Sequence, residues 1–326
     1  MNTPTAGGSG TSRGSSLPIL RVGNDELELA FLPTVGARLI SLRVGGAELL
    51  WRNPDHLDDD LGTVLPRDQW PPLDGTMGSW ANLGGSKTWP APQGWSGPDE
   101  WPGPPDPVLD SGDWRPEVLR TPDAATVVTF TSPEDPRTGL RVERRFEIPA
   151  AGTAFRQRIT FRCVADHPVR WAPWEVCQVD TAMFAGHDEP DAGVWVGVTG
   201  CHEPSALVRL DGEIAVGDPA DGRRRVEVAD VIAKVGFTDA DGTIEVVRPD
   251  GAGLRWTYHV APGAYPDGGC AAEIWMQYPA AGPVPGGLWP TARLLELEAL
   301  APLTTLDPGQ ELAFEIGWST WGPAAP

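Results

Sequence analysis

The chain has 326 residues, 40% of them hydrophobic, and a formal net charge of −20. This length allows one large all-β domain or two ordinary domains. The strong negative charge argues against a nucleic acid or an anionic membrane as a partner. No run of 18 apolar residues occurs, so we expect no membrane-spanning segment. Glycine (39 residues) and proline (35 residues) are abundant, which favours many short strands joined by turns.

Two kinds of segment open the chain. Residues 1–16 are rich in Gly, Ser and Thr and lack the apolar stretch of a signal peptide, so we expect a disordered tail on a cytoplasmic protein. Residues 17–51 predict a β-meander, because Leu27, Leu29 and Phe31 alternate with other residues. The Gly45-Gly46 pair that follows the next apolar run predicts a two-residue hairpin turn.

Residues 52–114 show neither the period of a strand nor that of a helix. Within them, residues 80–101 hold four tryptophans and one lysine. Three prolines there argue against both a helix and a central strand, so we predict an ordered loop. Indole rings beside polar groups suit a sugar, which stacks its C–H faces and hydrogen-bonds its hydroxyls. The alternative is that the tryptophans only cover the end of a β core. The candidate sugar-binding residues here are Trp89, Gln93 and Trp95, and Lys87 beside them is a candidate catalytic residue.

From residue 117 onward the pattern predicts a series of short strands and a single domain over residues 17–322. At most one helical turn is expected, at 229–234, and Arg223–Arg225 reads as a solvated turn. Such a chain favours a large antiparallel two-sheet sandwich. The expected strands are 117–121, 125–131, 140–147, 153–164, 168–179, 193–198, 205–210, 226–236, 243–248, 253–260, 270–278, 292–299 and 311–319.

Motifs for cofactors and metals are missing from the sequence. There is no dinucleotide-binding glycine fingerprint, no P-loop and no HExxH, and the five histidines lack metal-ligand spacing. We therefore expect neither a cofactor nor a metal ion.

Three stretches together resemble the galactose mutarotase-like, or aldose 1-epimerase-like, superfamily. They are ELAFLPTVGARLISLRVGGAELLWRNP at 28–54, YPDGGCAAEIWMQYP at 265–279 and LELEALAPLTTLDPGQELAFEIGWSTW at 295–321. The resemblance implies a β-supersandwich with a sugar site on one concave face, and it matches Glu273 to the family's catalytic glutamate. The chain departs from the family at the strand PVRWAPWEVCQV, which holds Glu175 and no histidine where the family has one.

Mutarotation needs a base for the anomeric hydroxyl and an acid for the ring oxygen. Glu273 is the expected base, with Glu175 or Lys87 as the acid. Because side chains alternate along a strand, Trp275 and Gln277 share a face with Glu273, whereas Glu175 and Gln178 lie on opposite faces. By the same alternation Glu296 and Glu298 share a face, which we expect to be exposed to solvent. The full set of candidate substrate-binding residues is Trp89, Gln93, Trp95, Trp174, Trp275 and Gln277.

Three functions remain open at this level. The first is a sugar 1-epimerase, and the second is a non-catalytic sugar-binding or sensing protein that has lost the family histidine. The third is an enzyme that cleaves glycosides with paired carboxylates. All three take a sugar or oligosaccharide as partner, and the oligomeric state stays open.

Overall fold

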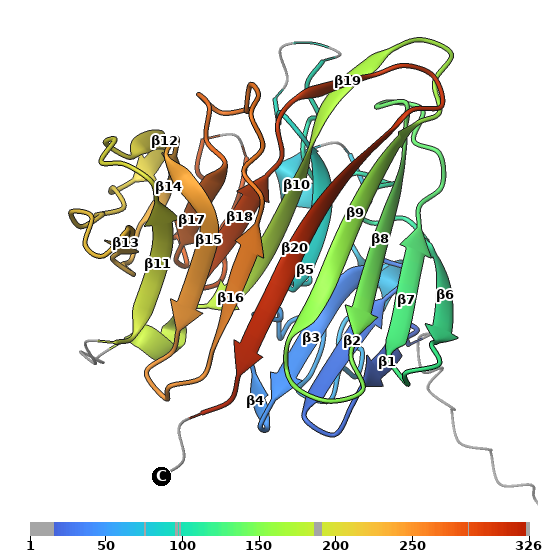
Figure 1. Ribbon diagram of the computed structural model, residues 1–326, viewed down its shortest axis with the longest axis horizontal. Helices are drawn as coiled ribbons and strands as arrows, with labels where there is room; N and C mark the ends of the chain where they lie inside the picture. The colour runs from blue at the N-terminus through green and yellow to red at the C-terminus, as the bar shows by residue number, and fades with distance from the viewer. Residues whose placement is uncertain are drawn as a thin grey trace, which may run out of the picture.

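The computed structural model describes residues 16–323 except 75, 95–96, 98, 186–190 and 286. In this part of the chain two antiparallel sheets pack face to face (Figure 1), which confirms the predicted all-β supersandwich. The tail predicted at residues 1–16 lies, apart from Ser16, outside the described residues. No helix within the described ranges is both long and apolar enough to cross a membrane. Helical structure there consists of three 3-10 turns, at Arg67–Gln69, Met77–Ser79 and Ala182–Phe184.

The larger sheet contains all the strands of the predicted meander and most of the candidate residues. Its longest strand is β10 (Val169–Asp180), near the middle of the sheet. Two short strands stand outside the main strand order: β4 (Ala47–Glu48) pairs with β3 (Arg38–Val44), and β19 (Thr304–Leu306) pairs with β10. The main path runs β1 (Leu20–Gly23), β2 (Leu27–Leu32), β3 (Arg38–Val44), β5 (Ser86–Ala91), β10 (Val169–Asp180), β18 (Leu294–Leu300), β17 (Ala272–Gln277), β14 (Ile232–Phe237) and β12 (Ser205–Asp211).

The smaller sheet lies in front of the larger one in Figure 1. Its order is β13 (Arg223–Val226), β11 (Gly193–Val198), β15 (Ala240–Val247), β16 (Gly253–Tyr258), β20 (Glu311–Trp321), β9 (Phe155–Cys163), β8 (Leu140–Ile148), β7 (Thr126–Thr131) and β6 (Arg115–Arg120).

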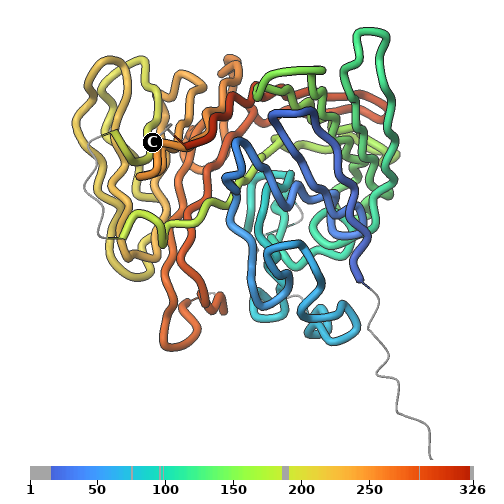
Figure 2. Tube along the Cα trace, turned by 90° about the horizontal axis from the view of Figure 1, so that it is seen from below, coloured from blue at the N-terminus to red at the C-terminus, as the bar shows by residue number. Residues whose placement is uncertain are grey.

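The two sheets differ in whether their outer face is covered. Along β8 buried residues alternate with more exposed ones, so one face of this strand packs on the core and the other meets solvent. Along β10 every residue from Trp171 to Val179 is buried. The larger sheet is therefore covered on its outer face too. Figure 2 shows the covering loops, a blue-to-cyan group between β4 and β6 and an orange loop between β17 and β18, which project from the side of this sheet away from the smaller one.

The loop predicted over residues 80–101 contains a strand, which corrects the sequence interpretation. β5 lies between β3 and β10, and Pro90 stands opposite Pro173 in the register. The carbonyl of Pro173 accepts a hydrogen bond from the backbone N–H of Ala301, just after β18. The backbone polar groups of Pro173 therefore face β18 and not β5, so the missing N–H of this proline removes no hydrogen bond between β5 and β10. On its other side β5 pairs with β3 only at Ser86, which leaves Pro90 effectively on an edge, where proline is tolerated.

Two further corrections concern residues 223–237. The expected single strand over 226–236 is two strands in different sheets, β13 and β14, and no helical turn forms at 229–234. The three arginines form part of β13, an edge strand, instead of a solvated turn. Arg224 is buried and donates hydrogen bonds to the carbonyls of Gly217 and His202. A charged side chain is accommodated there because backbone acceptors meet its guanidinium.

Candidate functional site

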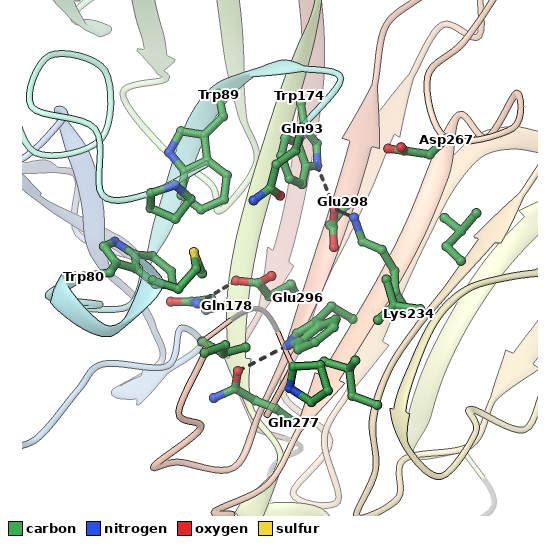
Figure 3. Close-up of a pocket in the computed structure, with 18 residues that line it drawn as sticks. Trp80, Trp89, Gln93, Trp174, Gln178, Lys234, Asp267, Gln277, Glu296 and Glu298 are labelled. Atoms are coloured by element: carbon green, nitrogen blue, oxygen red, sulfur yellow. Dashed lines mark hydrogen bonds and ion pairs between the residues drawn. The ribbon is translucent and has the colours of Figure 1, made fainter. Parts of the chain in front are cut away.

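A cleft of about 400 Å³ opens on the outer face of the larger sheet (Figure 3). Six neighbouring strands, from β5 to β12, contribute residues to it, and loops supply the rest of its walls. Alternation along the strands decides which side chains face it, because residues opposite one another in the register point to the same side. The lining residues are Met77, Trp80, Trp89, Gln93, Pro104, Trp174, Gln178, Leu207, Val208, Leu210, Lys234, Asp267, Trp275, Gln277, Pro285, Leu288, Glu296 and Glu298.

Tryptophan supplies much of the apolar surface of the cleft. The ring centroid of Trp89 lies 5.9 Å from that of Trp80 and 5.3 Å from that of Trp174. Trp101, fully buried, backs the same ring at 5.2 Å. Trp275 comes from β17, which is separated from β10 by β18. Edge-to-face contacts of this kind hold the indoles in fixed orientations, so the cleft has rigid flat walls.

A lysine between two glutamates lies at one end of the floor. Glu273 on β17 stands directly opposite Glu298 on β18. The Nζ of Lys234, from β14, is 2.6 Å from Glu273 Oε2 and 2.7 Å from Glu298 Oε2. The second oxygen of each carboxyl has no hydrogen-bond partner among the described residues. Trp174 donates its Nε1–H to Glu298 Oε2 at 2.7 Å, and its ring also contacts the ammonium.

The protonation of this cluster is set mainly by burial. Both glutamates are fully buried. Burial raises the pKa of Glu298 to about 7, against the attraction of Lys234. Burial likewise raises the pKa of Glu273 well above its ordinary value. Burial alone would lower the pKa of Lys234, but the two carboxylates raise it above its usual range. Near neutral pH the cluster thus combines a fixed cation with a carboxyl that can gain or lose a proton.

A second ion pair lies at the opposite end of the floor. Lys87 Nζ is 3.3 Å from Glu296 Oε1, and Gln178 donates its amide N–H to the same oxygen at 2.6 Å. The ammonium also contacts the rings of Trp80 and Trp89, at 4.9 and 4.7 Å from their centroids. Burial lowers the pKa of Lys87 to about 8. Lys87 and Lys234 are the only two lysines in the sequence, and both lie on this face of the sheet.

Glu175 lies on the other face of the sheet, which corrects its proposed role as the acid. It ion-pairs with Arg144 of the smaller sheet at 2.7 Å, and Ser86 and Thr88 donate their hydroxyls to it. Burial raises the pKa of this carboxyl. Glu175 therefore joins the two sheets inside the core, while Gln178, three residues later, faces the cleft as the alternation predicted.

The other predicted residues divide into three groups. Trp89, Gln93, Trp174, Trp275 and Gln277 line the cleft. Lys87 and Glu273 lie on the same face of the sheet but beneath the lining residues. Trp95 lies outside the described residues.

Sequence reasoning missed six lining residues with polar or aromatic side chains. The expectation that Glu296 and Glu298 form a solvent-exposed face was wrong for Glu298, which is fully buried, and Glu296 is partly buried, because loops distant in sequence cover this face. A signal for Lys234 was present, since lysine is so rare in the chain and this one interrupts an apolar strand. The missed residues are Trp80, Gln178, Lys234, Asp267, Glu296 and Glu298.

Metal binding has no candidate ligand set in the described part of the chain, where no group of three or more His, Cys, Asp or Glu side chains is placed to hold an ion. None of the residues that line the cleft is a histidine.

Comparison with known proteins identifies the fold. No protein-family model matches the sequence, and no curated protein matches it. Among solved structures, a galactose mutarotase-like protein from Lactobacillus casei has a TM-score of 0.53 and 13% identity, over 93% of this chain and all (100%) of that one. This chain has the galactose mutarotase-like fold. A galactose mutarotase related enzyme from Lactobacillus acidophilus agrees, with a TM-score of 0.52 and 10% identity over 94% of this chain and 98% of the other.

A third similar structure is larger. It is a TPR-domain containing protein from Parabacteroides distasonis, with a TM-score of 0.60 and 15% identity. The match covers 94% of this chain and 48% of that protein, so the chain spans about half the length of this neighbour. At these identities the likeness concerns the fold alone.

Proposed function

We propose that the cleft on the larger sheet binds a carbohydrate. The observation that carries this proposal is the combination of four tryptophans with amide and carboxylate side chains on one face. Indole rings offer flat apolar surface for the C–H faces of a pyranose, and amides and carboxylates offer hydrogen bonds to its hydroxyls. The volume of about 400 Å³ falls within the range of small-molecule sites, roughly 300–1,000 Å³.

A second candidate, sugar 1-epimerisation, is favoured by the carboxyls of β18. Glu296 and Glu298 both line the cleft and lie two residues apart on one face, roughly 7 Å along the strand. Glu296, paired with Lys87, is suited to take the proton of the anomeric hydroxyl. Glu298, with its pKa near 7, is suited to protonate the ring oxygen as the bond from that oxygen to the anomeric carbon breaks.

The ring-opened sugar then has a carbonyl at the anomeric carbon. Rotation about the adjacent carbon–carbon bond presents the other face of that carbonyl, and closure returns both protons. In this scheme Glu298 acts as the acid, in place of the family histidine that this chain lacks. Glu273, which does not line the cleft, acts through Lys234 by setting the charge beside Glu298.

Glycoside cleavage has less support. Hydrolysis by paired carboxyls requires them to flank the bond that breaks. Glu296 and Glu298 lie side by side on the floor, and Glu273 and Glu298 are bridged by the same ammonium.

The test is a titration with simple hexoses in which binding and anomer exchange are followed in the same samples. Tryptophan fluorescence reports binding, and NMR of the anomeric protons reports exchange. Binding with exchange above the spontaneous rate supports the epimerase. Binding without such exchange supports the non-catalytic sugar-binding protein, and the absence of binding across the hexoses would overturn the proposal.

A further inference from the structure

Most donor groups around the cleft have at least one acceptor within the protein. Trp80 and Trp89 donate their indole N–H groups to Asp110. Trp174 donates to Glu298, and Trp275 donates to Gln277. The amide N–H groups of Gln178 and Gln277 and the lysine ammonium groups also have acceptors in the protein. Gln93 is the lining residue whose amide stands outside this network of bonds.

The buried polar atoms of the cleft that have no partner among the described residues are acceptors. Glu298 Oε1 and Gln178 Oε1 are buried, and neither receives a hydrogen bond from the described residues. Both side chains line the cleft, with 0% and 1% of their residues' surfaces exposed. A buried acceptor without a donor is costly unless a ligand or water supplies one. The cleft is therefore built for a ligand that brings donors.

Asp267 adds a carboxylate that points into the same space (Figure 3). No described residue donates a hydrogen bond to it. Its backbone has φ of 50°, the left-handed region that residues other than glycine seldom adopt. The turn at Asp267-Gly268-Gly269 thus holds an aspartate in an unfavourable conformation, and such conformations gather at functional sites.

The charges that line the cleft are mostly negative. Of the lining carboxyl groups, Glu296 is paired with Lys87 and Glu298 shares the cation Lys234 with Glu273, whereas Asp267 has no ion-pair partner among the described residues. The faces of the tryptophans add negative potential of their own. A phosphate or carboxylate on a sugar would meet no free cation here, whereas an ammonium would meet unpaired carboxylate oxygens.

We propose that the cleft selects a protonated amino sugar over the corresponding neutral sugar and rejects anionic sugars. This inference rests on carbohydrate binding at the same site and names the class of sugar. The ammonium of the ligand lies within reach of Asp267 and Glu298, and the hydroxyls fill the remaining acceptors. A bound cation also favours the ionised form of Glu298.

The experiment compares glucosamine, glucose and glucuronate at pH 6.5, with galactosamine, galactose and galacturonate as a second set. Dissociation constants come from tryptophan fluorescence. We expect the amino sugar of the preferred set to bind about three- to tenfold more tightly than the neutral sugar, as partly exposed ion pairs and cation–π contacts allow. Binding of the uronate should be weaker than that of the neutral sugar. Raising the salt concentration should shrink both differences.

The variant Asp267→Asn removes the charge and keeps the backbone, because asparagine tolerates the left-handed conformation. In this variant the amino sugar and the neutral sugar should bind with more nearly equal affinities. Asp25→Asn, an exposed carboxylate in the turn between β1 and β2, makes the same charge change elsewhere and should leave the ratio as it is.

Each outcome bears on the proposal. An amino sugar that binds no better than the neutral one, or a uronate that binds as well, overturns the selectivity and leaves carbohydrate binding intact. A preference that persists in Asp267→Asn overturns the role of that carboxylate. No binding by any of the six sugars overturns both the inference and the proposed function.

Discussion

Glu273 and Glu298 face each other across the β17–β18 pair, and the ammonium of Lys234 lies within 2.7 Å of an oxygen of each. Two like charges opposite one another in a sheet repel, and burial makes that repulsion larger. The lysine offsets it, and the raised pKa of Glu298, to about 7, relieves it further because the carboxyl can hold a proton. The consequences of this arrangement can be measured.

The first prediction concerns stability. Lys234→Met leaves two buried carboxyls without a counter-charge and should lower the free energy of unfolding by about 3–5 kcal/mol at pH 7. Because folding raises the pKa of each glutamate, these two groups bind more protons in the folded protein than in the unfolded one. Their contribution to stability therefore falls as pH rises above about 4.5, for Glu298 until about pH 7. The loss should therefore be smaller at pH 5. Urea unfolding at both pH values measures it.

Arg120→Met is the matched control, since it removes an exposed cation from β6. It should change stability by no more than about 0.5 kcal/mol. If the Lys234→Met variant were as stable as this control at pH 7, Lys234 would not be the counter-charge of the two buried glutamates.

The second prediction uses the presence of only two lysines. NMR of protein with labelled lysine side chains should show two Nζ environments. The pKa of Lys87 is lowered to about 8 by burial, so its signal should titrate near that pH. The pKa of Lys234 is raised by its two carboxylates, so its signal should stay that of a charged amine through pH 10. If both lysines titrated together near pH 10.5, neither the lowered pKa of Lys87 nor the raised pKa of Lys234 would hold.

The third prediction assigns the proton-transfer group. If the protein exchanges anomers, Glu298→Gln should lower the rate by a factor of about 10²–10⁴, the usual effect of losing a positioned acid or base, with sugar affinity changed only a few-fold. Glu273→Gln should lower it less, because this side chain acts through Lys234. Exchange is read from the anomeric protons. An equal or larger loss in Glu273→Gln would return the base to Glu273.

The fourth prediction concerns the aromatic wall. Trp275→Ala removes an indole from the β17 side of the floor and should weaken sugar binding about tenfold, through lost stacking and lost apolar contact. Trp195→Ala, on β11 of the smaller sheet, is the control and should bind normally. Equal affinities for the two variants, measured by calorimetry, would argue against a sugar in this cleft.

The fifth prediction separates the core from the site. Glu175→Gln leaves Arg144 buried without its counter-ion and should destabilise the protein by about 3–5 kcal/mol. Per folded molecule, anomer exchange should match that of the wild type, because Glu175 faces the opposite side of the sheet. A hundredfold loss of exchange with the fold intact would restore Glu175 as the acid.

Local patterns in the sequence predicted most of the strands and the alternation along them. It predicted that Glu273, Trp275 and Gln277 share a face and that Glu175 and Gln178 do not, because the period of two is a local property of an extended chain. It also predicted the all-β class from its turns and short apolar runs. The error at β5 came from reading prolines without knowing the pairing that accommodates them.

Which face of the larger sheet is covered, and which strands are neighbours, depends on contacts between segments that are distant in the sequence. A pattern of alternation is the same whether its polar face meets water or a wall of loops, so Glu296 and Glu298 could not be distinguished from surface residues. Lys234 joins Glu273 and Glu298 because β14, β17 and β18 are adjacent, although β14 lies 35 or more residues before the other two. The candidate site is thus a product of strand order, which no local pattern in the sequence specifies.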